Sequence, residues 1–282
     1  MQALISNLQP QIPGLRPACR VIVDKPAAGS WNMAVDEALL DAAVQGGAAT
    51  LRFYQWSEPT LSLGYFQRYD DRHQHAASSA SAVVRRQSGG GAILHDRELT
   101  YSLTLPPSHP LTRDATALYT AVHDAFIQSL GPRLHSTRAP QWRLMLADGE
   151  SRLDPCQEPF LCFQRRACGD LLLARQDDST EPTPGSPTYK ILGSAQRRYR
   201  GAILQHGSLL VARSPAAPEL PGWDDLTGDS IPLDELVSDL ACRLFGRLGT
   251  EAPSGEIPAA IREMAREIEQ VRYSSRSWTL RR

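Results

Sequence analysis

The sequence lacks an excess of charge of either sign. Its 30 lysines and arginines stand against 31 aspartates and glutamates, and the formal net charge at pH 7 is −1. No global basic field can therefore recruit nucleic acid or a membrane surface, and any polyanion has to bind a local patch. An apolar run of membrane-spanning length is also missing. We expect no nucleic-acid partner and no membrane association.

Cysteines are few and odd in number. The chain of 282 residues contains five of them: Cys19, Cys156, Cys162, Cys168 and Cys242. The first residues do not resemble a signal peptide, because no basic segment is followed by an apolar core. These features favour free thiols in a reducing cytoplasm over a disulfide framework.

Two further signatures are missing. The glycines follow neither the Gly-x-Gly-x-x-Gly spacing of a Rossmann fold nor the Gly-Lys-Ser/Thr ending of a P-loop. The pair His73 and His75 has weak metal-ligand spacing, and we interpret residues 69–82 as a solvated loop or helix. Hydrophobic residues make up 41% and charged residues 22%, which is ordinary for a soluble globular protein.

The order of patterns predicts a mixed α/β body followed by a helical segment. Residues 1–19 have the character of a loose leader, and residues 20–213 alternate between strand-like and helix-like runs. After a proline-rich stretch at 214–222, two amphipathic helices follow. We therefore divide the chain into a leader, a catalytic body, and a linker with a C-terminal helical extension (214–282) packed on that body.

Helix boundaries follow from capping signals. Ser30 is expected to cap the first helix, and the acidic pair Asp36 and Glu37 then either opposes the helix dipole or faces a pocket. A second helix is expected over 111–130, with Gly131 as its stop.

A triple glycine follows two arginines in the segment RRQSGGGAILHD, residues 85–96. Three adjacent glycines let main-chain amides lie against a ligand, and arginines supply charge for a phosphate or a carboxylate. A glycine-rich hairpin turn is the alternative interpretation. Because a turn rarely needs three glycines, we favour a ligand-cradling loop.

A second informative stretch, residues 189–211, reads YKILGSAQRRYRGAILQHGSLLV. Lys190 begins a strand with small residues close behind it, an arrangement that lets a ligand approach the backbone. The local pattern is equally that of a β-hairpin with an exposed basic tip.

Together the two segments resemble the biotin/lipoate protein ligase superfamily. The resemblance rests on RRQSGGGAILHDRELTYSL (85–103) and KILGSAQRRYRGAILQHGSLL (190–210), and WNMAVDEALL (31–40), LRFYQWSEPTLSLGYFQ (51–67) and YSSRSWTL (273–280) fit it as well. It implies an α/β (α+β) fold in which helices flank a mixed β-sheet, like that of the lipoate ligase catalytic domain.

Two chemistries occur in this superfamily. Lipoate ligases use ATP to form an acyl-adenylate, whereas cysteine-dependent octanoyltransferases hold the acyl group on a cysteine. FLCFQR (160–165) is similar to the Cys-Phe motif of the octanoyltransferases, and HDRELTYS (95–102) to their version of the glycine segment. The chain departs from the pattern where Arg166 and Ala167 replace a Pro-Ser pair and where the loop 176–188 is long.

The resemblance implies Cys162 and Lys190 as catalytic residues, with Cys156 and Cys168 as competing nucleophiles and inert thiols as a further alternative. A neighbouring ammonium favours the reactive thiolate, and it can also orient the acyl carbonyl. His95 and His206 are candidate bases or structural histidines. The expected substrate-binding residues are Arg86, Ser88, Gly89, Gly90, Gly91, His95, Gly193, Ser194, Ala195, His206 and Gly207.

The leading hypothesis is an octanoyl-[acyl carrier protein]:protein N-octanoyltransferase that needs no cofactor, neither metal nor ATP. Its partners would be acyl carrier protein and a lipoyl carrier domain, such as that of glycine cleavage H protein or a 2-oxoacid dehydrogenase E2. An ATP-dependent lipoate–protein ligase, an amidotransferase between carrier proteins and a non-catalytic acyl-binding protein are the alternatives. The basic residues Arg197, Arg198 and Arg200 are expected to steer acidic carriers towards the site.

Overall fold

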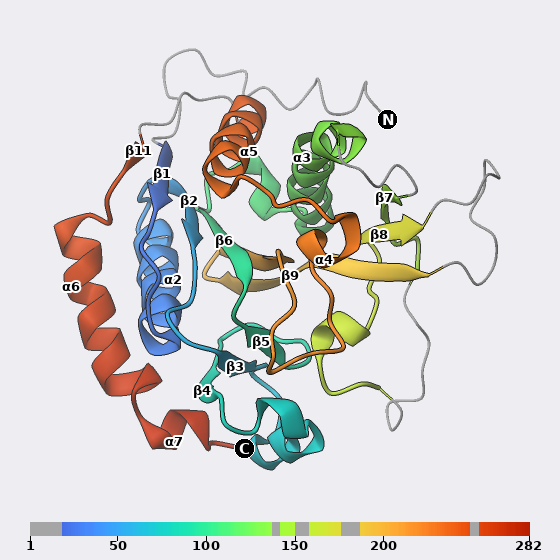
Figure 1. Cartoon of the computed structure of the whole chain (residues 1–282). Coiled ribbons are helices and arrows are strands. Elements are labelled where there is room, and N and C mark those ends of the chain that lie inside the picture. The colour runs from blue at the N-terminus through green and yellow to red at the C-terminus, as the bar shows by residue number, and fades with distance from the viewer. Residues whose placement is uncertain (1–18, 137–141, 150–157, 176–186, 249–253) are drawn as a thin grey trace.

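The computed structural model describes residues 19–136, 142–149, 158–175, 187–248 and 254–282 (Figure 1). Within these residues, eight strands form one mixed sheet in the order β11-β1-β2-β6-β10-β9-β8-β7. β1 runs parallel to its neighbours β2 and β11, and the remaining neighbours pair antiparallel. The strands are β1 (Cys19–Val23), β2 (Ala49–Tyr54), β6 (Glu98–Leu105), β7 (Trp142–Leu146), β8 (Leu171–Arg175), β9 (Thr188–Tyr199), β10 (Ala202–Leu210) and β11 (Ser254–Gly255).

A smaller sheet of three strands, β4-β3-β5, lies beside the large one and holds the triple-glycine loop. Its strands are β3 (Thr60–Leu63), β4 (Ala82–Arg85) and β5 (Ile93–His95). The short 3₁₀ helices η1 (Tyr69–Gln74) and η2 (Ala76–Ser78) connect β3 to β4. The arrangement of helices and mixed sheet confirms the predicted fold class.

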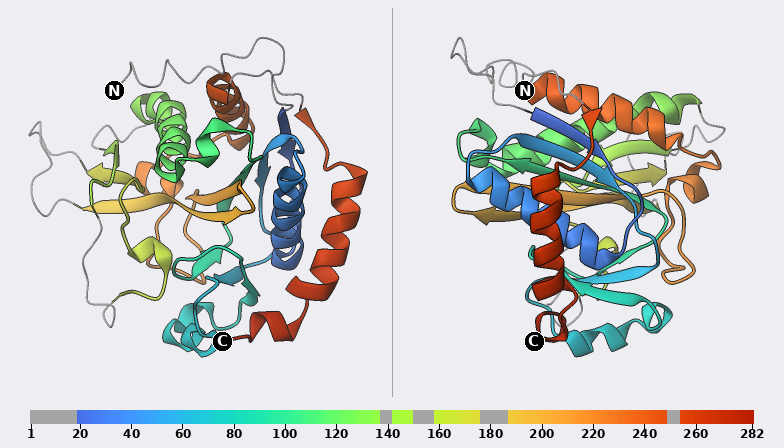
Figure 2. Two further views of the ribbon diagram at one scale, coloured as in Figure 1. Left: turned by 180° about the vertical axis from the view of Figure 1, so that it is seen from behind. Right: turned by 90° about the vertical axis from the view of Figure 1, so that its left-hand side faces the viewer.

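Helices cover both faces of the large sheet. α3 (Ala115–Ser136) and α5 (Leu233–Leu248) share one hydrophobic core with the sheet, whereas α2 (Gly29–Val44) packs on the opposite face. α6 (Ala259–Ile268) lies outside α2, so the C-terminal part of the chain packs on the body (Figure 2). The remaining helical segments are η3 (Pro110–Thr112), η5 (Cys162–Gln164), α4 (Trp223–Thr227), the π-helix η6 (Glu269–Tyr273) and α7 (Arg276–Thr279).

Alternation along β6 gives the sheet one apolar and one polar face. Leu99, Tyr101, Leu103 and Leu105 belong to the core beneath α3 and α5. The residues between them point towards α2, because side chains of a strand alternate between its two faces. That second face carries Glu98, Thr100, Ser102 and Thr104, all buried. It supplies a polar floor for the site described below.

Three sequence expectations about helices are wrong. Ser30 does not cap α2: its N-cap residue is Ala28, and the Ser30 hydroxyl donates to Glu269. The acidic pair of α2 lies beyond the first helical turn, and Asp36 forms an ion pair with Arg52 instead of opposing the dipole.

α3 does not stop at Gly131 but continues through Pro132 to Ser136. The buried side chains Leu130 and Leu134 pack in the core on both sides of these helix-breaking residues. Apolar burial offsets the backbone cost of the Gly-Pro pair.

The hairpin of β9 and β10 has the expected basic tip. Tyr199 pairs with Ala202, and the two residues between them, Arg200 and Gly201, both have positive φ. Two such residues fit a tight turn whose twist matches that of the strands.

The leader and most of the loop 176–188 lie outside the described residues, and the domain boundary at residue 213 stays a prediction. No helix in the described part of the chain is long and apolar enough to cross a membrane.

Candidate active site

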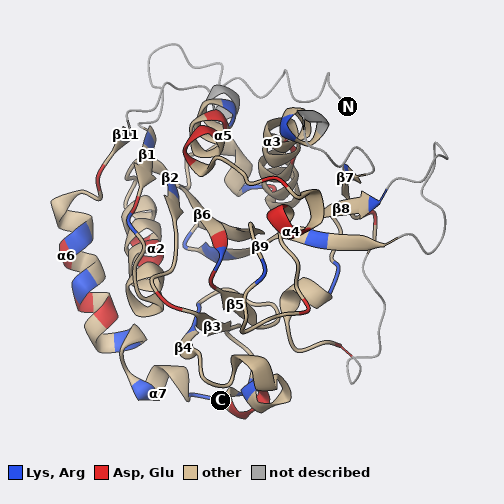
Figure 3. Cartoon of the chain, in the orientation of Figure 1, with Lys and Arg blue, Asp and Glu red and all other residues tan. Residues whose placement is uncertain are grey.

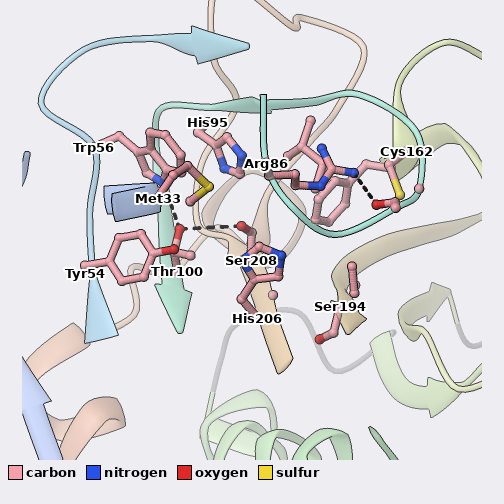
Figure 4. A pocket seen from close by; sticks show the side chains of 17 residues that line it. Met33, Tyr54, Trp56, Arg86, His95, Thr100, Cys162, Ser194, His206 and Ser208 are labelled. Carbon is pink, nitrogen blue, oxygen red and sulfur yellow. Dashed lines mark hydrogen bonds between the residues drawn. The ribbon is translucent and has the colours of Figure 1, made fainter. Parts of the chain in front are cut away.

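A cavity of about 520 Å³, open space at its mouth included, lies between the triple-glycine loop and the centre of the large sheet. Figure 4 shows Cys162 on one side and the side chains of Met33, Tyr54 and Trp56 on the opposite side. The cavity therefore offers a sulfur at one end and apolar surface at the other.

Most of the predicted site residues line this cavity. They are Arg86, Gly89, Gly90, His95, Cys162, Gly193, Ser194, Ala195, His206 and Gly207. Ser88, Gly91 and Lys190 lie directly behind it: Ser88 contacts His206, Gly91 accepts from Arg86, and Lys190 contacts Cys162. Cys168 is exposed and does not line the cavity, while Cys156 falls outside the described residues.

Cys162 is held against the triple-glycine loop. Its backbone N–H donates to the Ala92 carbonyl at 2.7 Å, and the neighbouring side chains Leu161 and Phe163 are buried. The thiol is free and half-buried. Segments about 70 residues apart in the chain thus place a thiol at the edge of the glycine loop.

Lys190 supplies a cation beside this thiol. Its Nζ lies 3.9 Å from Cys162 Sγ and 3.4 Å from the Cys162 carbonyl oxygen. An ammonium at this distance attracts negative charge that develops on the sulfur. A second hollow, on the other side of Phe163, reaches Lys190 between η5 and residues 219–221.

Asp170, which the sequence reading missed, fixes the position of Lys190. Its Oδ2 lies 2.8 Å from Lys190 Nζ, and both side chains are at most 4% exposed. The Tyr119 hydroxyl donates to Asp170 Oδ1 at 2.8 Å, and the Ala167 N–H donates to Oδ2. Burial, together with the Asp170 charge, raises the pKa of Tyr119 far above its usual value, so Tyr119 stays a donor.

Glycines at the site are required by close contacts. A Cβ at Gly193 would lie 2.4 Å from Lys190 Cε, so this glycine, which also lines the cavity, makes room for the lysine side chain. A Cβ at Gly64 would lie 2.1 Å from the Gly90 carbonyl oxygen, where the triple-glycine loop crosses the end of β3. Gly90 itself has a φ of +92°, which favours glycine.

The two arginines before the loop donate to backbone carbonyl oxygens of the protein. Arg86 donates to the carbonyl oxygens of Ser62, Gly89 and Gly91 and thereby shapes the loop. Burial lowers its pKa to about 10, while the nearby charge of Cys162 acts in the opposite direction. Arg85 points away and donates to the carbonyl oxygen of Thr279, so its expected role as an anion ligand is wrong.

The histidines predicted as possible bases are tied into the protein at both ring nitrogens. His95 contacts Glu98 through Nδ1 and Ser62 through Nε2, and its ring stacks on Trp56 with centroids 3.9 Å apart. Burial lowers its pKa. His206 contacts Ser88 and Asp36. These contacts favour the structural interpretation of both residues.

The carboxylate of Asp36 lies beneath the cavity, in contact with His206. Burial acts to raise its pKa, but the hydrogen bond to His206 and the charge of Arg52 lower it overall. Tyr54 and Ser102 also donate to it. Asp36 does not line the cavity itself, but it contacts His206, which does.

His123, a second residue that the sequence reading missed, is wholly buried behind Ser194. Its Nδ1 lies 2.7 Å from the Gly169 carbonyl oxygen, which can only accept, so Nδ1 carries the proton. Nε2 then accepts from the Ser194 hydroxyl at 2.7 Å, and burial lowers the pKa of His123 to about 4. No local motif marks His123 or Asp170, because His123 forms hydrogen bonds with residues at least 46 positions away and Asp170 contacts Lys190 and Tyr119, which are 20 and 51 positions away.

Comparison with known proteins agrees with this geometry. Residues 28–217 match the model of the lipoyl protein ligase A/B catalytic domain. "Octanoyltransferase LipM" of Kyrpidia tusciae is 30% identical over 93% of this chain and 98% of its own length. The protein of the same name from Staphylococcus aureus is 34% identical over 64% of this chain and 61% of its own length.

Among solved structures, a putative lipoate protein ligase from T. acidophilum matches with a TM-score of 0.67 and 21% identity, covering 94% of this chain and all of that one. A lipoate-protein ligase A bound with ATP matches with a TM-score of 0.65 and 20% identity, covering 93% of this chain and 98% of that one. At such identities these structures establish the shared fold.

Proposed function

The chain belongs to the lipoyl protein ligase A/B catalytic domain family, and from that premise we propose that it transfers an octanoyl group from acyl carrier protein to a lipoyl-domain lysine through a thioester on Cys162. Octanoyl transfer in lipoate biosynthesis is the function indicated by relatives that align along nearly the whole chain. The donor and the cysteine intermediate are inferred from the chemistry of the site.

One observation carries the proposal: Cys162 Sγ lies 3.9 Å from the ammonium of Lys190, at the end of a cavity that has apolar side chains opposite. A thiolate attacks a thioester without prior activation of the acyl group by ATP, since one thioester replaces another of similar energy. The apolar end gives the hydrocarbon chain a place out of water.

In the first half-reaction, Cys162 passes its proton to the departing thiol. Its sulfur attacks the thioester carbonyl carbon, the bond from that carbon to the donor sulfur breaks, and the donor leaves as a free thiol. The Lys190 ammonium stabilises the thiolate and the negative charge that develops on the carbonyl oxygen. Asp170 keeps that ammonium in place.

In the second half-reaction, the neutral amine of the acceptor lysine attacks the acyl-enzyme. A C–N bond forms, the bond from the carbonyl carbon to Cys162 Sγ breaks, and the amine proton passes to the sulfur. We infer that the amine enters through the hollow beside Lys190, which Phe163 separates from the cavity. The products are an octanoyl amide and regenerated Cys162.

The test is the intact mass of the protein after incubation with octanoyl-acyl carrier protein in the absence of ATP. Wild type is expected to gain one octanoyl group that hydroxylamine removes, and Cys162→Ala is expected to gain none. Cys168→Ala is the matched control, because that thiol is exposed and outside the cavity, and Cys156→Ala tests the third thiol. Modification that depends on ATP and free octanoate and survives in Cys162→Ala would show a ligase instead.

A further inference from the structure

The molecule has an exposed patch of aromatic and arginine side chains beside the triple-glycine loop. Phe66 is 67% exposed, which is unusual for a phenylalanine, and its ring meets that of Tyr65 edge to face at 5.0 Å. Three arginines surround these rings. We call the five residues the arginine–aromatic rim: Tyr65, Phe66, Arg197, Arg281 and Arg282.

Residues distant in sequence are fixed in this rim. The guanidinium of Arg281 lies 4.4 Å from the centre of the Tyr65 ring, and that of Arg282 lies 5.3 Å from the centre of Phe66. The Arg282 carbonyl oxygen accepts from the Tyr69 N–H at 2.8 Å. In Figure 3, basic residues are coloured along the chain from α7 to the end marked C. The two arginines are therefore held by stacking and by a backbone hydrogen bond.

The rim is continuous with the lining of the cavity. A Cβ on Gly89, which lines the cavity, would lie 3.9 Å from the Phe66 ring. On the other side, Arg197 follows the lining residue Ala195 on the same face of β9, and its guanidinium lies 5.9 Å from the Tyr65 ring. The rim thus lies next to the loop that also holds Cys162.

Positive charge in this region is not neutralised within the described residues. Burial lowers the pKa of Arg85, and the charges of Arg281 and Arg282 lower it further. No ion pair of the described chain involves Arg197, Arg281 or Arg282. Unpaired arginines around an exposed aromatic ring form a surface typical of a contact with an acidic protein.

We propose that the arginine–aromatic rim docks the acidic protein that carries the acyl thioester, an inference that rests on the proposed octanoyl transfer. Phe66 would enter an apolar depression of that carrier, and Arg197, Arg281 and Arg282 would face its carboxylates. The rim contacts the Gly89 side of the loop, whereas Cys162 is bonded to Ala92 on the far side. We assign the rim to the donor because a pantetheine arm lets a carrier dock on one side of the loop while its thioester reaches Cys162 on the other.

This surface differs from the basic tip that the sequence suggested. Of the three arginines at that hairpin, Arg197 belongs to the rim. Arg200 lies near Asp41 of α2. Burial raises the pKa of Asp41, and the charge of Arg200 acts in the opposite direction. Arg198 alternates with Arg197 along β9 and therefore faces away from it.

The experiment compares donors in the Arg281→Glu/Arg282→Glu variant. With octanoyl-acyl carrier protein, kcat/KM for acylation of Cys162 is expected to fall about tenfold or more, through KM, and to lose most of its salt dependence. With octanoyl-N-acetylcysteamine, which has no carrier, the rate is expected to stay within about twofold of wild type. Arg281→Lys/Arg282→Lys should restore most of the carrier-dependent rate.

Arg262→Glu/Arg266→Glu on α6 is the matched control, because it makes the same change of charge on an outer helix. An unchanged kcat/KM for the carrier donor in the rim variant would overturn the proposal. An equal loss of kcat/KM with octanoyl-4′-phosphopantetheine would also overturn it, because the rim would then be a phosphate site. A loss confined to transfer onto the lipoyl domain would overturn it as well. Absence of acylation in wild type with every donor would instead refute the proposed function.

Discussion

Lys190 is held between Asp170 and Cys162: its Nζ lies 2.8 Å from Asp170 Oδ2 and 3.9 Å from Cys162 Sγ. Burying an ammonium without a partner is costly, so the carboxylate of Asp170 is what allows the charge to remain beside the sulfur. The same carboxylate is fixed by Tyr119 and the Ala167 N–H. Asp170 therefore acts as a positioning residue for the proposed catalytic pair.

The first prediction concerns this ion pair. Asp170→Asn leaves Lys190 without a counter-ion, and we expect acylation of Cys162 by a small thioester to slow roughly 10- to 100-fold. The loss should appear in kcat more than in KM, because Asp170 does not line the acyl cavity. Alkylation of Cys162 by iodoacetamide, followed against pH, provides the independent measurement. A wild-type pH profile in the variant would contradict the positioning role.

Tyr119→Phe is the graded control, because it removes the hydrogen bond to Asp170, together with one from the Ser194 N–H, and leaves the ion pair. A loss of about tenfold or less is expected. An effect larger than that of Asp170→Asn would place the important contact on the tyrosine and not on the carboxylate.

The second prediction concerns Gly193. Its Cβ in Gly193→Ala would lie 2.4 Å from Lys190 Cε and 2.8 Å from Nζ, so the lysine side chain has to move away from Cys162. A displacement of this size at a reacting pair is expected to lower kcat by about 100-fold. Gly255→Ala is the matched control, since that strand glycine has nothing within 4 Å of its Cβ position. Equal activity of the two variants would refute the steric argument.

The sequence predicted the residues that line the cavity better than it predicted the helix ends. The motifs at residues 85–103 and 190–210 lead to the cavity because each brings its residues together locally on a loop or strand. Contacts that join distant segments carry no local signal. Asp170 meets Lys190 only after β8 and β9 pair, and α3 runs past Gly131 because tertiary packing outweighs local propensity. Arg86 illustrates the same limit, since its anion-binding pattern is used to hold the loop.

The third prediction concerns pH and His123. Burial lowers the pKa of His123 to about 4, below the value of about 6.5 expected in the unfolded chain. The unfolded state therefore binds more protons between these two values, and the folded state loses stability as pH falls from about 6.5 to 4. His123 alone should contribute a loss of about 3 kcal/mol in the free energy of unfolding across that range.

Urea unfolding of wild type and His123→Gln at pH 7 and pH 4.5 measures this contribution. The variant is expected to be less stable at pH 7, where Ser194 loses an acceptor, but to lose less stability on acidification. His73→Asn is the control, because this histidine is exposed in η1. Parallel pH dependences of wild type and His123→Gln would show that His123 is not the titrating group.

The last prediction concerns the length of the acyl chain. Met33 lines the cavity on the side opposite Cys162, so its side chain limits how far a hydrocarbon tail can extend from the sulfur (Figure 4). Met33→Ala removes that limit, and each additional buried methylene contributes about 0.8 kcal/mol, or roughly fourfold in relative kcat/KM. We therefore expect the ratio of decanoyl to octanoyl transfer to rise about tenfold, measured by competition between the two thioesters and mass analysis of the acyl-enzyme. Met264→Ala on α6 is the matched control, because it removes the same side chain from a partly buried position outside the cavity. An unchanged ratio in Met33→Ala would mean that the acyl chain does not extend towards Met33, and the apolar end of the cavity would then lose its assignment.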